Sequence, residues 1–328
     1  MSIPTTQRVI VISKAGGPDV LVPAEVPVPS PGEGQVLIEV AAAGINRHDV
    51  HQRANGIHHD GSPTPGLEVC GRVVAVGAGV TAPAIGDRVM ALVQGGGYGE
   101  YAVAAAALAL PVPENVSDAE AACVPEALFT AWWNYFGLMD LQKDQFGLFH
   151  GGTSGVGHLA LQALSALGYR VIATAGSERK VKAAKEFGAF EALNYNDAAL
   201  AEKVLDATDG TGISCLIDVS AGAHLTQDVA MMAPDGTIAH LSAGGGAELS
   251  LPLRSIMAKR IRITGSFLRP LALELKTQVA DRLRREVLPL IGNEVRPVIA
   301  QQFELMDAKG AHAGMEKASH IGKIVLVA

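Results

Sequence analysis

Short apolar runs of β type follow one another through about the first 124 residues, and such runs indicate strands. Gly and Pro bound these runs. Residues Pro23 to Pro31 are predicted to form an extended proline-rich connector, and no helical pattern precedes about residue 117. Ser117 to Glu120 resembles a capping box, and a helix is predicted to continue from Pro125 to Phe136. The predicted strands are 9–13, 35–43, 71–76, 87–92 and 100–104.

A different pattern follows between about residues 145 and 268, where short apolar runs alternate with helical ones. Such alternation indicates a parallel sheet covered on both faces, and therefore an α/β fold. Strands are predicted near 147–150, 170–174, 191–194, 213–219, 236–242 and 260–266, with helices near 155–168, 177–187, 197–207 and 223–232.

The C-terminal tail departs from this alternation. It contains helices predicted near 271–288 and 307–318 and strands around Phe303 and at 324–327. We expect it to fold back onto the N-terminal β domain. The predicted domains are therefore 1–124 together with 269–328, and 125–268.

A glycine-rich turn connects the first strand of the α/β segment to its helix. Glycines there let the backbone approach a pyrophosphate, and the N-terminus of the helix presents free N–H groups to it. Because the turn stands between a predicted strand and a predicted helix, it indicates a dinucleotide site. The expected binding residues are Gly152, Thr153, Ser154, Gly155 and Val156.

The end of the second strand of this segment distinguishes the two nicotinamide coenzymes. An NAD site usually has Asp or Glu there to bind the ribose hydroxyls, but this chain has Ala175, Gly176 and Ser177, followed by Lys180. A hydroxyl and an ammonium group attract a 2′-phosphate, so we expect NADPH. Ser177 can also cap the following helix, and Glu178 is the competing candidate for a ribose ligand.

Composition narrows the functional classes. The chain has 328 residues and a net charge of −7, so we expect no nucleic-acid partner. Its three cysteines are widely separated and have no metal-ligand spacing. No leader pattern and no run of the length of a membrane span is present, so we expect a soluble, cytoplasmic protein without a membrane partner.

Several long motifs in the same order resemble the medium-chain dehydrogenase/reductase superfamily, and within it the zinc-free quinone oxidoreductase branch that includes zeta-crystallin. They include AAAGINRHD at 41–49, PGLEVCGRVVAVG at 65–77, HGGTSGVG at 150–157 and IGKIVL at 321–326. The resemblance implies a GroES-like β-barrel catalytic domain, a doubly wound Rossmann domain that binds NADPH, a cleft between the two, and a homodimer. It adds Tyr195 to Ser177 and Lys180 as ligands of the 2′-phosphate. It also implies nicotinamide contacts at Thr130, Ser242, Gly244 and Phe267.

The resemblance also implies that zinc is absent. Zinc-bearing relatives have ligands at the positions of Asn46, Leu67 and often Glu126, and one carboxylate does not bind zinc tightly. Without a Lewis acid, acceptors that delocalise incoming charge are favoured, so we expect a quinone substrate. Asn46 either positions the substrate or ties its loop together, and Asp49 orients that loop. Arg269 either lies near the substrate or faces solvent.

Three alternatives stay open. The same site would serve a 2-alkenal or enone reductase, and a protein that binds NADPH without catalysis would carry the same glycine turn. The local cluster His48, His51, His58 and His59 could bind a metal if its loop folds back, although a polar loop is the simpler interpretation.

Overall fold

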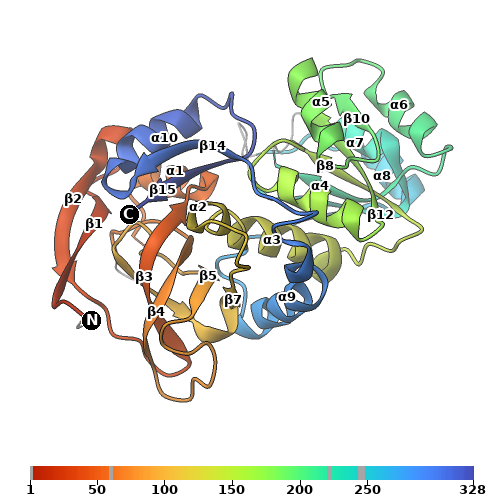
Figure 1. Cartoon of the computed structure of the whole chain (residues 1–328). Coiled ribbons are helices and arrows are strands. Elements are labelled where there is room, and N and C mark those ends of the chain that lie inside the picture. The colour runs from red at the N-terminus through yellow and green to blue at the C-terminus, as the bar shows by residue number, and fades with distance from the viewer. Residues whose placement is uncertain (1–2, 59–61, 220–223, 243–247) are drawn as a thin grey trace. The chain divides into compact units, whose positions relative to one another are not determined.

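A computed structural model describes residues 3–58, 62–219, 224–242 and 248–328 of the chain. The chain divides into two compact units. The first unit comprises residues 1–127, 276–292 and 296–328, and the second comprises residues 128–275 and 293–295. Each unit is described by itself below, with the element labels of Figure 1.

The first unit is built on a seven-stranded sheet in the order β14-β15-β3-β4-β5-β7, in which β6 also pairs with β3, and on a separate β1-β2 hairpin. Val36, Leu37, Ile38 and Val40 of β3 are all buried, so both faces of this strand are largely covered. The C-terminal tail does return to this unit, because β15 pairs antiparallel with β3. Its strands are β1 (Thr6–Ile12), β2 (Leu21–Pro27), β3 (Gln35–Gly44), β4 (Glu68–Val76), β5 (Arg88–Leu92), β6 (Tyr101–Ala105), β7 (Ala109–Pro111), β14 (Ile299–Glu304) and β15 (Lys323–Val327).

Among the described residues, the first unit has fewer helices than the second, and the longest of them is α9. They are α1 (Arg47–Asn55), α2 (Asp118–Ala121), α9 (Leu273–Glu286, whose first residues belong to the second unit) and α10 (Ala308–Glu316). Helix α10 packs against β14 and β15, and the three lie side by side in Figure 1.

Helix α1 contradicts the expectation that no helix precedes residue 117. Its sequence is almost entirely polar, so it lacks the apolar periodicity that reveals a helix. Two terminal signals were present instead. Asp49 accepts a hydrogen bond from the backbone N–H of the N-cap residue Asn46, and Gly56 ends the helix with φ 62°. The connector predicted at Pro23 to Pro31 is also partly wrong, since its first half belongs to β2.

The second unit confirms the predicted alternation. Its six-stranded sheet has the order β10-β9-β8-β11-β12-β13, and every pairing is parallel. All five residues of β8 are buried, as expected for a strand with both faces covered. The strands are β8 (Phe146–His150), β9 (Arg170–Ala175), β10 (Ala192–Asn194), β11 (Ile213–Asp218), β12 (Met232–His240) and β13 (Arg262–Gly265).

Helices of the second unit lie against this sheet, with α4 and α5 on β9 and with α7 and α8 on β12. They are α3 (Pro125–Trp132, whose first residues belong to the first unit), a π-helical turn (Trp133–Leu138), α4 (Gly157–Ala166), α5 (Glu178–Glu186), α6 (Leu200–Ala207), α7 (Leu225–Met231) and α8 (Leu253–Lys259). Helix α8 was not predicted, and none of its residues is buried.

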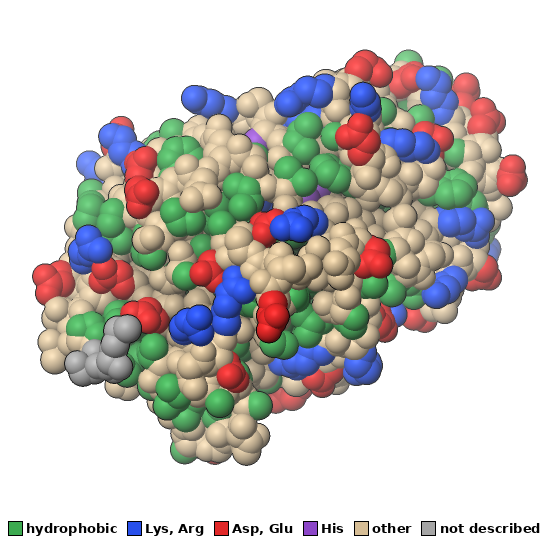
Figure 2. All heavy atoms as spheres, in the orientation of Figure 1, with side chains coloured by type: hydrophobic (Ala, Val, Ile, Leu, Met, Phe, Trp, Pro, Cys, Tyr) green, Lys and Arg blue, Asp and Glu red, His purple; other side chains and the backbone are tan. Residues whose placement is uncertain are grey.

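Two further properties bear on possible partners. On the face shown in Figure 2, Lys and Arg side chains are interspersed with Asp and Glu side chains. Among the described helices, none is both long and apolar enough to cross a membrane.

Candidate active site

The glycine turn after β8 leaves backbone donors available. The amides of Gly151 and Gly152 both donate to the carbonyl of Thr174. The Ser154 hydroxyl, at the middle position of the glycine motif, accepts from the N–H of Gly157 at 3.0 Å and so supports the start of α4. Within the described residues, the amides of Gly155 and Val156 donate to no protein acceptor. Unpaired N–H groups at the N-terminus of a helix suit an anionic group.

The predicted phosphate ligands meet at the carboxyl ends of β9 and β10. A Cβ atom on Gly176 would overlap the hydroxyl of Tyr195, so only glycine allows this tyrosine to lie against the end of β9. Ser177 is the N-cap of α5, and its Oγ accepts from the N–H of Lys180. The competing ribose ligand, Glu178, accepts a hydrogen bond from Asn194 at 3.5 Å on the exposed surface.

The charge at this edge is positive. Burial, and then the neighbouring Arg179, lower the pKa of Lys180, so a negative group beside this ammonium ion would favour its charged form. Arg179 was not among the predicted residues, although its position next to Lys180 was a visible signal. The edge therefore has a hydroxyl, a phenol, two cations and the exposed carboxylate of Glu178.

Other predicted residues of the second unit form a further group. The amide Nδ2 of Asn134 donates to the carbonyl of Thr130 at 2.8 Å, and its Oδ1 accepts from the hydroxyl of Ser266. Asn134 thus links Thr130 to the segment of Phe267, which is 73% exposed. Sequence reasoning missed Asn134, because no motif marks it.

The remaining predicted residues are described only in part. Ser242 and Arg269 are partly buried and each has an interaction partner. Gly244 lies outside the described residues.

In the first unit, Asn46 belongs to a buried polar cluster formed with Glu68 and Lys323. Its Nδ2 donates to Oε1 of Glu68 at 2.8 Å, and its Oδ1 accepts from Nζ of Lys323 at 2.6 Å. Lys323 also forms an ion pair with Oε1 of Glu68, and both side chains are at most 2% exposed. Oε2 of Glu68 accepts from the backbone N–H of Glu126. Every oxygen of the buried carboxylate therefore has a donor, as the burial of a charge requires.

Glu68 and Lys323 were missed by sequence reasoning. Each is a charge at the first position of a mostly apolar strand, β4 and β15 respectively, and that was the available signal. The carboxyl of Glu126 is affected by the same cluster. Burial raises its pKa to about 8 and the negative charge of Glu68 contributes, so Glu126 carries its proton at neutral pH.

A second buried chain of hydrogen bonds starts at Asp49. Its Oδ2 accepts from the hydroxyl of Tyr98 at 3.0 Å, and the Tyr98 oxygen lies 3.0 Å from Nε2 of His312. Nδ1 of His312 faces the Arg53 guanidinium, which can only donate, so the imidazole proton lies on Nε2. Burial raises the pKa of Asp49 to about 7 and lowers that of His312 to about 3. This chain fixes α1, consistent with the orienting role expected for Asp49.

The histidine cluster gives no metal arrangement where it can be followed. His48 and His51 both lie on α1, and Nε2 of His58 lies 3.2 Å from the carbonyl of Ile12. His59 is not among the described residues. In the described part of the chain, no three His, Cys, Asp or Glu side chains are placed to hold a metal ion.

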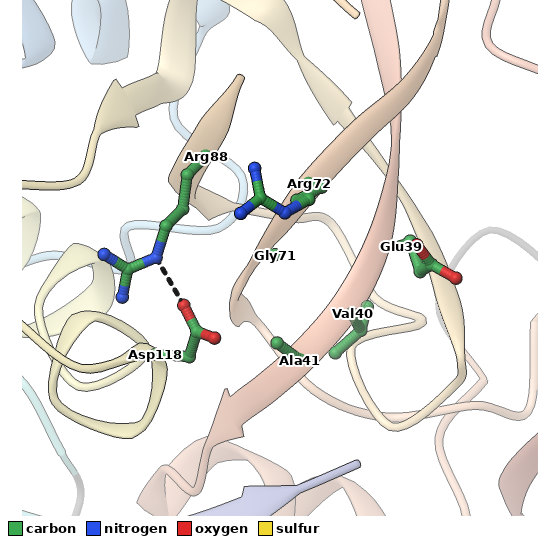
Figure 3. Close-up of a pocket in the computed structure, with 7 residues that line it drawn as sticks. All are labelled: Glu39, Val40, Ala41, Gly71, Arg72, Arg88 and Asp118. Atoms are coloured by element: carbon green, nitrogen blue, oxygen red, sulfur yellow. Dashed lines mark hydrogen bonds and ion pairs between the residues drawn. The ribbon is translucent and has the colours of Figure 1, made fainter. Parts of the chain in front are cut away.

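A polar hollow of about 290 Å³ also opens on the sheet of the first unit. Figure 3 shows Arg88 paired with Asp118 at one side of it and Arg72 above Gly71. Both guanidinium groups already donate to backbone carbonyls. The hollow contains none of the predicted site residues.

Two family descriptions match the chain: an alcohol dehydrogenase GroES-like domain over residues 32–114 and a zinc-binding dehydrogenase over residues 155–284. The quinone oxidoreductase of Rattus norvegicus is 31% identical over 98% of this chain and 97% of its own length. The chain belongs to the medium-chain dehydrogenase/reductase superfamily. Its resemblance to the zinc-free quinone oxidoreductase branch is supported by the same relatives.

Solved structures agree with this membership. A mycobacterial protein in complex with NADPH is 30% identical, with a TM-score of 0.85 over 98% of this chain and 100% of that one. The quinone oxidoreductase of Escherichia coli in complex with NADPH is 26% identical, with the same TM-score and the same coverage. The fold is thus that of a dehydrogenase/reductase with a GroES-like domain and a Rossmann domain.

One of the matched families is described as zinc-binding, and the resemblance puts its zinc ligands at positions 46, 67 and 126 of this chain. Position 46 is an amide whose oxygen and nitrogen both have protein partners, and position 67 is Leu, so Glu126 is the one residue of the three that could act as a ligand. Catalytic zinc sites of proteins use three Cys, His or carboxylate ligands. These residues of the dehydrogenase/reductase chain do not fit zinc.

Removing the ammonium group of the buried cluster should destabilise the protein. We expect Lys323→Met to cost about 3–5 kcal/mol, because Glu68 would keep a buried charge without a counter-ion. Thermal melting of the variant measures this loss. The matched control is the double variant Glu68→Gln with Lys323→Met, which removes both charges and should recover most of the melting temperature. Equal melting temperatures for the single and double variants would contradict the ion-pair assignment.

Proposed function

We propose that the protein is an NADPH-dependent quinone oxidoreductase that works without zinc. The observation that carries this proposal is the Asn46–Glu68–Lys323 cluster. Asn46 stands where zinc-bearing relatives have a metal ligand, and both polar atoms of its amide already have protein partners. Such a site lacks the Lewis acid that stabilises an alkoxide. Quinones and enones delocalise incoming charge themselves, so they need positioning and hydrogen-bond donors rather than a metal.

The residues of the second unit suit NADPH. The free amides of Gly155 and Val156 would bind the pyrophosphate, while Ser177, Lys180 and Tyr195 would hold the 2′-phosphate. When bound, NADPH supplies a hydride, and the quinone also takes up a proton from solvent to give the hydroquinone. The mycobacterial and Escherichia coli structures in complex with NADPH support this choice.

The substrate class is tested with a panel of acceptors. We expect NADPH oxidation to be fast with ortho- or para-quinones and at least tenfold slower in kcat/KM with 2-alkenals and other enones. Faster turnover of alkenals would make the protein an enone reductase. Tight NADPH binding without turnover of any acceptor would favour a non-catalytic role.

The coenzyme preference is tested at Lys180. We expect Lys180→Ala to lower kcat/KM for NADPH about 10- to 100-fold and to leave that for NADH unchanged, because a charged hydrogen bond contributes about 1.5–3 kcal/mol. The matched control is Lys182→Ala, which removes an ammonium group from the same helix. The side chain of Lys182 is 81% exposed. An unchanged ratio of NADPH to NADH in the Lys180 variant would refute the phosphate assignment.

We also propose that the protein forms a homodimer through the second unit and works in the cytoplasm. Among the described residues, β13 pairs only with β12, so its other edge is available to another strand. Leu253 and Met257 of α8, which precedes β13, are 61% and 70% exposed. Buried free cysteines, at positions 70, 123 and 215, suit a reducing compartment.

The dimer is tested by light scattering after size exclusion. We expect a dimeric wild type, and a monomer for Met257→Glu because a charge would be buried in the contact. Ile85→Glu, at a site 65% exposed in the first unit, is the matched control and should stay dimeric. A monomeric wild type would contradict the proposal.

A further inference from the structure

Two histidines end strands at the same edge of the parallel sheet, and their environments differ. His150 ends β8 and uses both ring nitrogens: Nδ1 lies 2.7 Å from the Thr174 hydroxyl and Nε2 lies 2.9 Å from Oδ1 of Asp228. His240 ends β12 and uses one. Its Nδ1 lies 3.1 Å from Oδ2 of Asp218, while Nε2 is buried without any partner among the described residues. His150 is therefore satisfied by the fold, and His240 is not.

The pair of His240 and Asp218 is built into the sheet. Asp218 ends β11, and the two residues are direct partners in the parallel register of β11 and β12. The Asp218 carboxylate is fully buried, and the His240 side chain is 12% exposed. Because a carboxylate only accepts hydrogen bonds, the imidazole proton lies on Nδ1, and Nε2 of the neutral ring is an acceptor. A buried acceptor without a donor costs about 1–3 kcal/mol, so a ligand that supplies one would be stabilised.

The order of the strands indicates which half of the coenzyme would lie near Nε2 of His240. From β8 the chain proceeds to β9 and β10 on one side, and then to β11, β12 and β13 on the other. In such a fold a dinucleotide lies across the carboxyl ends at the point where the order reverses, with its pyrophosphate at the turn after the first strand. The end of β9 carries Ser177 and Lys180 for the adenosine half. The nicotinamide half must then extend over the ends of β11 and β12, where Asp218 and His240 lie.

We propose that Nε2 of His240, held by Asp218, accepts a hydrogen bond from the nicotinamide half of NADPH. The donors available on that half are the carboxamide amino group and the ribose hydroxyls. Asp218 is a positioning residue, since it sets the tautomer that makes Nε2 an acceptor. This inference rests on the proposed use of NADPH. It adds His240 to the coenzyme site, a residue that neither the glycine turn nor the predicted phosphate ligands point to.

Binding measurements by titration calorimetry test the proposal with two ligands. NADPH contains both halves of the coenzyme, and 2′,5′-ADP contains only the adenosine half. We expect His240→Leu to raise the Kd for NADPH about five- to tenfold, the factor that one hydrogen bond gives. The Kd for 2′,5′-ADP should stay within about twofold of wild type, because that ligand does not reach β12.

Two further variants separate a contact from a packing effect. His240→Gln offers a carbonyl oxygen as acceptor and should recover part of the affinity for NADPH. Asp218→Asn keeps the imidazole but can donate to Nδ1, which moves the ring proton to Nε2 and should weaken NADPH binding as His240→Leu does. The reduced 3-acetylpyridine analogue of NADPH lacks the amino group. If His240→Leu loses its effect with this analogue, the donor is the carboxamide, and if the effect persists, the donor is a ribose hydroxyl.

These measurements separate a failure of the His240 contact from a failure of the proposed use of NADPH. A wild-type protein that binds neither NADPH nor 2′,5′-ADP would refute the use of NADPH. If the wild type binds both, an unchanged Kd for NADPH in His240→Leu overturns the contact. An equal loss of affinity for both ligands also overturns it, because the variant would then act on the fold.

Discussion

The polar interior of the first unit depends on one ion pair, between Lys323 and Glu68, which is fully withdrawn from solvent. Burial of either charge alone would be prohibitive, so the segments that carry them must meet. Gly44 makes room for this contact, since a Cβ there would collide with Oε1 of Glu68. The pair then orients the amide of Asn46 and the first turn of α3 through hydrogen bonds.

The second unit depends on its parallel sheet, in which the carboxyl ends of all strands lie at the same edge. Because the strand order reverses at β8, two sets of polar side chains appear on either side of the glycine turn. One set, at β9 and β10, carries hydroxyl and cationic groups. The other, at β11 and β12, carries a carboxylate and an imidazole acceptor. This division matches the two chemically different halves of a dinucleotide.

Local features were predictable where a residue's own neighbours determine its conformation. The alternation of strands and helices in the second unit and the glycine turn were of this kind, and both are confirmed. Helix α1 was not predicted, because its residues are almost all polar and the contacts of its capping residue Asp49 with Tyr98, and of Tyr98 with His312, join distant parts of the chain. Helix α8 was missed because none of its residues is buried, so its sequence does not need a regular apolar face.

By itself, the sequence determined the alternation of strands and helices in the second unit, the position of the glycine turn and the lack of an acid at the end of β9, because each depends on a few consecutive residues. Only the tertiary structure decided that Asn46, Glu68 and Lys323 share one buried cluster, and that Asp218 faces His240. Those pairings join residues 22 to 277 positions apart. No local pattern encodes such contacts, because the pairing of strands and the exclusion of water create them.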